Sequence, residues 1–101
     1  MKKYEIYVGL NDKDTGKEKL TSDDFARILS EICANRKIGF TMSTQFGGYA
    51  HNQGYVVENS LKVTLLNIEE EQVEEIGRIL KERINTDTIM ITSEDCMFYY
   101  R

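Results

Sequence analysis

The order of two periodicities along the chain is the feature that most constrains its fold. In residues 4–10 every second side chain is large and apolar, which is the period of a strand with one buried face. From Phe25 to Cys33 apolar residues recur at three- and four-residue spacing, which is the period of a helix with one buried stripe. Both patterns return in the second half of the chain. Strands and helices must therefore share a core.

Cues for a helix start and a helix end flank the first apolar stripe. Thr21 suits the N-cap position, and Asp23 and Asp24 place negative charge near the positive end of the helix dipole. Gly39 follows a basic segment, and glycine readily adopts the left-handed conformation that ends many helices. We therefore predict a helix over residues 21–36.

Two further alternating segments, residues 40–46 and 55–66, flank a glycine-rich segment at residues 47–54. In the second of them Leu61 and Leu65 face inward, and the polar residues that alternate with them face outward, so the sheet has one solvated face. Two alternating segments joined by a short glycine-containing loop predict an antiparallel hairpin.

The rest of the chain supplies one more helix and at least one more strand. An apolar stripe predicts a second helix over residues 68–85, and Asn67 and Glu70 have the spacing of a capping box. A strand is expected at residues 89–92. After a turn, residues 96–100 have the pattern of an extra aromatic strand at the C-terminus.

The predicted order is thus β-α-β-β-α-β, within a single α+β domain over residues 1–101. Two helices that are far apart in sequence must both cover one face of an antiparallel sheet. Right-handed crossovers then leave the ferredoxin-like sandwich as the simplest arrangement, with the extra C-terminal strand as an option. The same pattern also permits a swapped or more open sheet in a dimer.

Composition limits the partners and the location that we expect. The formal net charge of −4 argues against a large phosphate-binding surface, so nucleic acid is not an expected partner. The N-terminal residues enter the alternation without the apolar run of a signal or a membrane span, so we expect a cytoplasmic protein with no membrane partner. In such a protein Cys33 and Cys96 are expected to be unbridged thiols.

The glycine-rich segment 47–54 is the most site-like stretch of the sequence. Its glycines allow a close approach to a ligand, and Tyr49, His51 and Asn52 offer donors and acceptors. An ordinary hairpin tip has the same composition, and we prefer that interpretation. His51 has no neighbour that must orient its ring, so an exposed loop histidine is preferred over an acid–base catalyst. The two cysteines lack metal-ligand spacing, and we expect neither a metal nor a cofactor.

The solvated face of the sheet is the second candidate surface. Tyr7, Glu58 and Ser60 are expected to lie on it. Aromatic residues on such a face stack RNA bases in some domains of this topology, but basic side chains are scarce here. An interface between copies of the chain is the preferred interpretation, and Phe98 and Tyr100 of the terminal strand are its expected residues.

Four stretches, taken in order, resemble a family of small bacterial domains of unknown function, many of them lipoproteins. They are residues 7–11 (YVGLN), 39–41 (GFT), 54–63 (GYVVENSLKV) and 96–98 (CMF). The resemblance covers nearly the whole chain and implies a ferredoxin-like fold, with Glu58 and Ser60 as family-like positions of no assigned role. The chain departs from the family in having no export signal or lipobox, and in carrying Tyr49 where a tryptophan-containing segment is expected.

Three classes of function stay open. A non-enzymatic binding or interaction module that self-associates is preferred, because no catalytic constellation stands out. The first alternative is a small dimeric ferredoxin-like enzyme with a pocket between sheet and helices near Tyr7, His51 and Glu58. The second is a sensor or sequestering protein that binds a nucleotide-like small molecule at a subunit junction. This fold serves all three classes and does not rank them.

Overall fold

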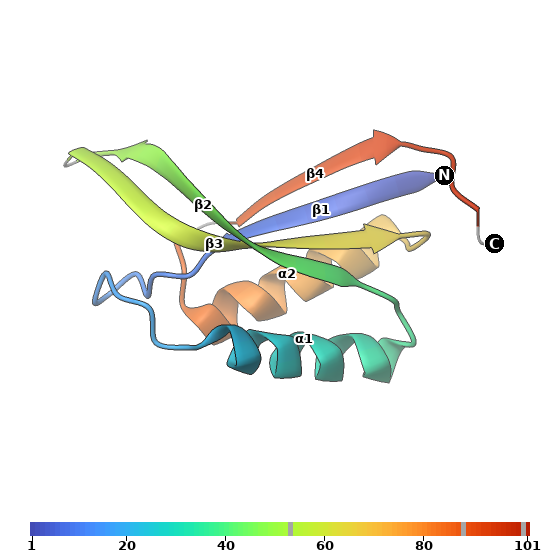
Figure 1. Ribbon diagram of the computed structural model, residues 1–101, viewed down its shortest axis with the longest axis horizontal. Helices are drawn as coiled ribbons and strands as arrows, with labels where there is room; N and C mark the ends of the chain where they lie inside the picture. Colours follow the sequence, from blue (N-terminus) through green and yellow to red (C-terminus); the bar gives the residue numbers. More distant parts are fainter. Residues whose placement is uncertain (53, 88, 100) are drawn as a thin grey trace.

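A four-stranded antiparallel sheet carries both helices on one of its faces (Figure 1). The computed structural model describes residues 1–52, 54–87, 89–99 and 101, and for His51 the backbone alone. In chain order the elements are β1 (Lys2–Gly9), α1 (Ser22–Arg36), β2 (Thr41–His51), β3 (Gly54–Leu66), α2 (Glu70–Ile84) and β4 (Ile89–Asp95).

The strands lie in the order β2-β3-β1-β4, with β1 paired to both β3 and β4. Consecutive strands β2 and β3 form the predicted hairpin, whereas each helix connects two strands that are separated by another strand in the sheet. This is the ferredoxin-like sandwich, so the predicted fold is confirmed. The alternation in residues 4–10 also behaves as expected, because Ile6 and Val8 are fully buried beneath the helices.

Both apolar helix stripes supply the core. Phe25 and Leu29 of α1 meet Ile76 and Leu80 of α2 and the inward side chains of β1 and β3 in one cluster. Burying side chains of this size stabilises the fold by roughly 1.5–3 kcal/mol each. Because this cluster lies entirely on the helix side, the opposite face of the sheet is free to carry polar groups.

The residues that cap the helices can be compared with the capping residues predicted from the sequence. The Asp24 backbone N–H donates to Thr21 Oγ1 at 3.1 Å and the Thr21 N–H donates to Asp24 Oδ2 at 2.8 Å, as the N-cap prediction requires. α1 ends at Arg36 as predicted, but Lys37, and not Gly39, adopts the left-handed conformation, with φ 57°. The cap therefore lies two residues before the glycine.

The second helix begins later than its sequence cue. Its N-cap is Glu69, whose backbone N–H donates to Gln72 Oε1 at 3.2 Å. Asn67 instead lies in a left-handed turn with φ 58° between β3 and the helix. The predicted capping pair of Asn67 and Glu70 is therefore wrong by two positions. A turn is needed first, since β3 runs on to Leu66 as the partner of Lys3.

The glycine-rich segment is a strand and not the long loop that the sequence suggests. Gly47 pairs with Glu58, and Tyr49 pairs with Val56, so β2 and β3 continue almost to the tip of the hairpin. The ladder satisfies the backbone groups that a loop would leave to water. A β-carbon at Gly48 would lie 2.6 Å from the ring of Tyr55, so the absent side chain makes room for that ring.

The C-terminal segment also differs from the prediction. Residues 93–95 belong to β4 and do not turn, because their backbone pairs with residues 2–4 of β1. Ion pairs of Lys2 with Asp95 at 3.2 Å and of Lys3 with Glu94 at 2.7 Å accompany this pairing. Within the described residues 96–99 the extra strand is absent. Tyr100 lies outside the described residues.

Two further findings concern the thiols and the helices. Cys33 and Cys96 are both free, and burial raises the pKa of the Cys33 thiol, which lies in the core. Among the residues that the structure describes, no helix is both long and apolar enough to cross a membrane.

Candidate functional site

A cleft of about 650 Å³ lies where the end of β1, the β2–β3 hairpin and the start of β4 meet. This volume is within the range of roughly 300–1,000 Å³ that small-molecule sites occupy. Its polar lining side chains come from all three places. They are Tyr7, Tyr49, Glu58, Ser60, Thr86 and Asp87.

Strand alternation shows on which side of the sheet this cleft lies. Ser60 and Glu58 alternate along β3 with the fully buried Leu61, and Tyr7 alternates along β1 with the buried Ile6 and Val8. Their side chains therefore point away from the helices. The cleft belongs to the open face, rather than to the space between sheet and helices.

Glu58 is held in place by the backbone around it. Its Oε2 accepts a hydrogen bond from the backbone N–H of Asn11 at 3.1 Å. A β-carbon at Gly9 would collide with its carboxylate, so the carboxylate lies directly over the backbone of β1 at that residue. Any side chain at Gly9 would displace it. Glycine at this position and the Asn11 amide together fix the orientation of Glu58.

The electrostatics of the cleft are those of an acidic site. Burial, followed by the nearby carboxylates of Glu58 and Asp87, raises the pKa of the Tyr49 hydroxyl. None of the described lining residues is Lys, Arg or His. Two carboxylates without a basic partner in the lining attract a cation and repel an anion.

The remaining lining is aromatic and apolar. Tyr7 and Tyr49 supply rings, whose faces attract cations, and Met90 and Ile89 supply flexible or branched apolar contacts. On the same face, but nearer the start of β1, Lys62 and Glu5 form an ion pair at 2.9 Å. The open face is thus divided into a region of paired charges and an acidic, aromatic cleft.

A smaller cavity of about 150 Å³ adjoins this cleft. It is lined by the loop between β1 and α1 from Asn11 to Lys13, and it shares Tyr49, Glu58 and Asp87 with the larger cleft. Glu58 therefore lies at the boundary of the two spaces. A ligand in the larger cleft would reach the loop by passing this carboxylate.

The site residues expected from the sequence divide into three groups. Tyr7, Tyr49, Glu58 and Ser60 line the same cleft. Asn52 is exposed at the hairpin tip and does not line it, and the side chain of His51 is outside the described part of the chain. Of the two expected interface residues, Phe98 is half-buried, and Tyr100 is not among the described residues.

Sequence reasoning missed Gly9, Thr86, Asp87 and Met90. A glycine at the outward position of the alternating segment 4–10 is the only local signal of the role of Gly9, and it is equally typical of a strand end. Asp87 reaches the cleft only because the segment after α2 runs beside the end of β1. No pattern within residues 85–88 indicates that.

No family model matches the chain, and no curated protein matches it. Solved structures do match. A phage S-adenosylmethionine lyase in complex with S-methyl-5′-thioadenosine has a TM-score of 0.75 and 22% sequence identity, covering 93% of this chain and 80% of the lyase chain. A phage S-adenosylmethionine lyase in its apo state also has a TM-score of 0.75 and 22% sequence identity, covering 92% of this chain and 78% of that lyase chain.

Two other structures match less closely. The complex of GlnK with ATP from B. subtilis has a TM-score of 0.51 and 11% identity, covering 93% of this chain and 84% of GlnK. A DUF3240 family protein from Shewanella baltica OS155 has a TM-score of 0.50 and 8% identity, covering 99% of this chain and 94% of that protein. At such identities the likeness shows the fold alone. A family of unknown function thus shares this fold, but no matching family model places the chain in it.

Proposed function

We propose that the chain binds S-adenosylmethionine in the cleft and cleaves it, releasing S-methyl-5′-thioadenosine. The observation that carries this proposal is the acidic and aromatic lining. Glu58 and Asp87 contribute negative charge, and Tyr7 and Tyr49 contribute aromatic rings. The class of ligand comes from the phage lyase of the same fold, whose structure contains S-methyl-5′-thioadenosine.

The charge of the lining distinguishes this ligand from a nucleotide such as the ATP bound to GlnK. ATP carries several negative charges, and protein sites for phosphate rely on Lys, Arg or helix N-termini. The described lining has no Lys or Arg, so Glu58 and Asp87 would repel a triphosphate. A sulfonium cation is attracted both by carboxylates and by aromatic faces. The lining therefore favours S-adenosylmethionine over ATP.

The chemistry that releases the thioether is simple in outline. The bond between the sulfonium sulfur and the γ carbon of the amino-acid chain breaks, and its electron pair stays on sulfur, which becomes neutral. The carbon fragment either loses a proton to a base, leaving an alkene, or closes on its own carboxylate as a lactone. Glu58 is the base in the first route and holds the sulfonium in both. Both routes neutralise the charge on sulfur, and Ile89 and Met90 add apolar contacts to the lining around it.

The test is to incubate the protein with S-adenosylmethionine and to quantify S-methyl-5′-thioadenosine by liquid chromatography and mass spectrometry. Wild type is expected to release it. Glu58→Gln is expected to lower kcat/KM by roughly 10²–10⁴-fold, as removal of a general base does. Glu74→Gln, the same substitution on an exposed position of α2, is the matched control and should leave the rate unchanged.

Calorimetric titration with S-adenosylmethionine and with ATP separates the remaining functions. Binding of S-adenosylmethionine without turnover would contradict the proposed lyase activity and would favour a sensor or sequestering protein. Tighter binding of ATP would contradict the charge argument. If neither ligand binds, the proposal is overturned, and an interaction module becomes the preferred function.

Self-association is a second proposal, and a separate surface supports it. The β2–β3 hairpin extends beyond the helices (Figure 1). On the face that the helices no longer cover, Phe46 is 73% exposed and Tyr55 is 71% exposed, with Val57 beside them. Apolar clusters of this kind on a monomer usually mark an interaction surface. We infer that a second copy of the chain covers this cluster, most simply around a two-fold axis.

A further inference from the structure

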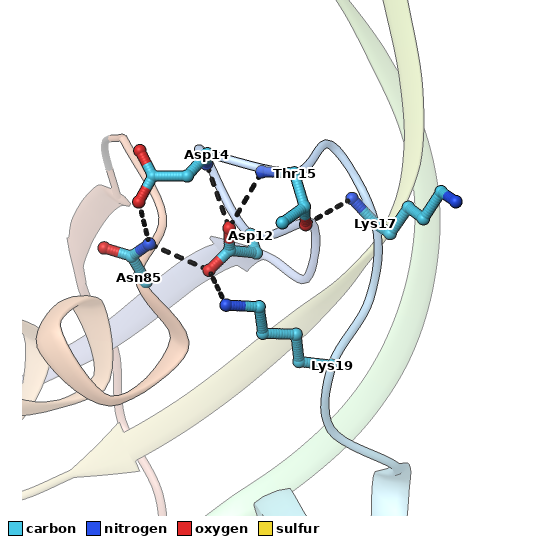
Figure 2. Close-up of polar contacts among 6 residues, drawn as sticks. All are labelled: Asp12, Asp14, Thr15, Lys17, Lys19 and Asn85. Carbon is cyan, nitrogen blue, oxygen red and sulfur yellow. Dashed lines mark hydrogen bonds and ion pairs between the residues drawn. The ribbon is translucent and has the colours of Figure 1, made fainter.

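The loop between β1 and α1 contains a buried carboxylate. Asp12 is only 1% exposed, and four donors surround it (Figure 2). Its Oδ1 accepts from the backbone N–H groups of Asp14 and Thr15 at 2.9 and 3.0 Å. Its Oδ2 accepts from Asn85 Nδ2 at 2.8 Å and from Lys19 Nζ at 2.9 Å. Every one of these contacts requires the ionised carboxylate or an equivalent acceptor.

These contacts set the charge state of Asp12. The side-chain hydrogen bond from Asn85, followed by that from Lys19, holds the pKa of this carboxyl far below its usual value, against the effect of burial. The group is therefore charged at neutral pH. An amide in its place would turn an N–H₂ group toward two donors. Asp12 is thus one of few side chains that satisfy this position.

On one side, the Asp12 contacts fasten the loop to the end of α2. Asn85 caps that helix in the left-handed conformation with φ 60°, and its backbone oxygen accepts from the Lys13 N–H at 2.8 Å. Its Nδ2 also donates to Asp14 Oδ2 at 2.9 Å. The next residues along the chain, Thr86 and Asp87, line the cleft. The wall that carries Asp87 therefore begins at a residue held by Asp12.

On the other side, the same contacts fix the support of Glu58. Asn11 is bonded directly to Asp12 in the chain, and its N–H is the donor to Glu58 Oε2. The Asp12 N–H donates to the Lys17 oxygen at 2.8 Å, which closes the loop on itself. If Asp12 moves, Asn11 moves with it. Both carboxylates of the cleft are then linked to this one buried residue.

We propose that Asp12 is a positioning residue, which sets the orientation of Glu58 and the place of the cleft wall at Thr86 and Asp87. It does not contact the ligand, because its side chain is fully buried. The consequence for cleavage rests on the proposed function, but the link from Asp12 to Glu58 does not. A purely structural role would instead stabilise the loop without affecting Glu58.

The first test observes this link without any ligand. In two-dimensional ¹H–¹⁵N NMR spectra the Asn11 amide reports its hydrogen bond to Glu58, so Glu58→Gln is expected to shift that resonance. Asp12→Asn should shift it as well. Asp23→Asn, the same substitution at an exposed position in the first turn of α1, outside the contacts of Asp12 and Asn85, should leave it near its wild-type place. An Asn11 resonance that Asp12→Asn leaves unchanged would overturn the proposal.

A second variant guards against failure of Asp12→Asn to fold. Asn85→Gly keeps the left-handed backbone, which glycine adopts freely, and removes only the side chain that donates to Asp12. It is expected to shift the Asn11 resonance in the same direction. A folded Asn85→Gly variant whose Asn11 amide resonance is unchanged would also contradict the link from Asp12 to Glu58.

The second test uses turnover. Displacement of a reacting group by about 1 Å can cost on the order of 100-fold in rate. We therefore expect Asp12→Asn to lower kcat/KM for S-adenosylmethionine by about 10- to 100-fold, and Asp23→Asn to have little effect. A lower unfolding temperature with unchanged kcat/KM would show a structural role only. If wild type itself does not cleave the substrate, the proposed function fails, and the Asn11 resonance alone decides the role of Asp12.

Discussion

Glu58 and Gly9 show how one missing side chain can decide the position of another. The carboxylate occupies the space that a β-carbon at Gly9 would need, and the Asn11 N–H holds its far oxygen. In both contacts the partner of the carboxylate is backbone, which fixes where the carboxylate can lie. A small change at Gly9 should therefore act on Glu58 more than on the fold.

Gly9→Ala tests this arrangement. The backbone at Gly9 is not in the left-handed region, so alanine is tolerated there, but its methyl group forces Glu58 into another rotamer. We expect release of S-methyl-5′-thioadenosine to fall by about tenfold or more, with little change in unfolding temperature. Gly39→Ala, where a β-carbon meets nothing within 4 Å, is the control. Equal rates for the two variants would show that the position of Glu58 does not matter.

Asp12 also predicts how stability depends on pH. Its pKa is lowered in the folded chain, so its contribution is complete above the unfolded value of about 3.9 and is lost as the pH falls toward the folded value. The unfolding temperature should therefore fall more steeply below about pH 4 in wild type than in Asp12→Asn. Other carboxyls whose pKa is lowered leave a residual slope in the variant. They are Glu5, Asp24 and Glu75.

Thermal unfolding by circular dichroism between pH 2 and 7 gives this measurement. Asp23→Asn, at an exposed position in the first turn of α1, is the matched control, since it leaves the contacts of Asp12 intact and should keep the wild-type slope. A variant of Asp12 with the full wild-type slope would show that this carboxylate does not stabilise the folded chain through its charge.

At the scale of elements, the periodicities predicted the order and type of the elements from β1 to β4, but they also predicted a strand over residues 96–100 that the described residues 96–99 do not form. They failed where a distant partner decided the outcome. Residues 93–95 have turn-forming side chains, yet pairing with residues 2–4 of β1 keeps them in β4. Likewise the glycines near Gly48 signal a loop, but pairing with β3 extends the strand. In both places strand pairing outweighed the local turn or loop propensity.

In the candidate site, too, local patterns predicted some residues, and contacts between distant segments decided the others. Tyr7 and Glu58 were accessible to sequence reasoning, because their residue types and the strand alternation together place them on a solvated face. Asp12 and Asp87 were not, because their roles depend on how the loop after β1 meets the segment after α2. Contacts such as Asp12 to Asn85 join residues 73 positions apart, and no local pattern encodes them.

At the scale of the whole molecule, the two candidate interfaces lie at opposite ends. The hairpin extends from one end of the sheet, and the C-terminus lies at the other, beside the N-terminus (Figure 1). The sequence directs attention to Phe98 and Tyr100 at the C-terminal end, whereas the most exposed apolar cluster on the sheet is Phe46, Tyr55 and Val57 on the hairpin. A two-fold dimer that forms through one end leaves the other end free. The hairpin interface and the C-terminal interface are therefore alternatives in a simple dimer.

Sedimentation velocity distinguishes these ends. Phe46→Lys places a charge in the hairpin cluster, where a second copy would bury it without a partner, and it is expected to give a monomer. Met97→Lys, on an even more exposed apolar residue at the other end, is the matched control and should leave the assembly intact. Removal of residues 97–101 should likewise leave it intact. Dissociation by that truncation, with Phe46→Lys still associated, would assign the interface to the terminal segment. A wild-type protein that is monomeric at about 100 µM would contradict both candidate interfaces. An interface that buries large aromatic side chains ordinarily has a dissociation constant below that concentration.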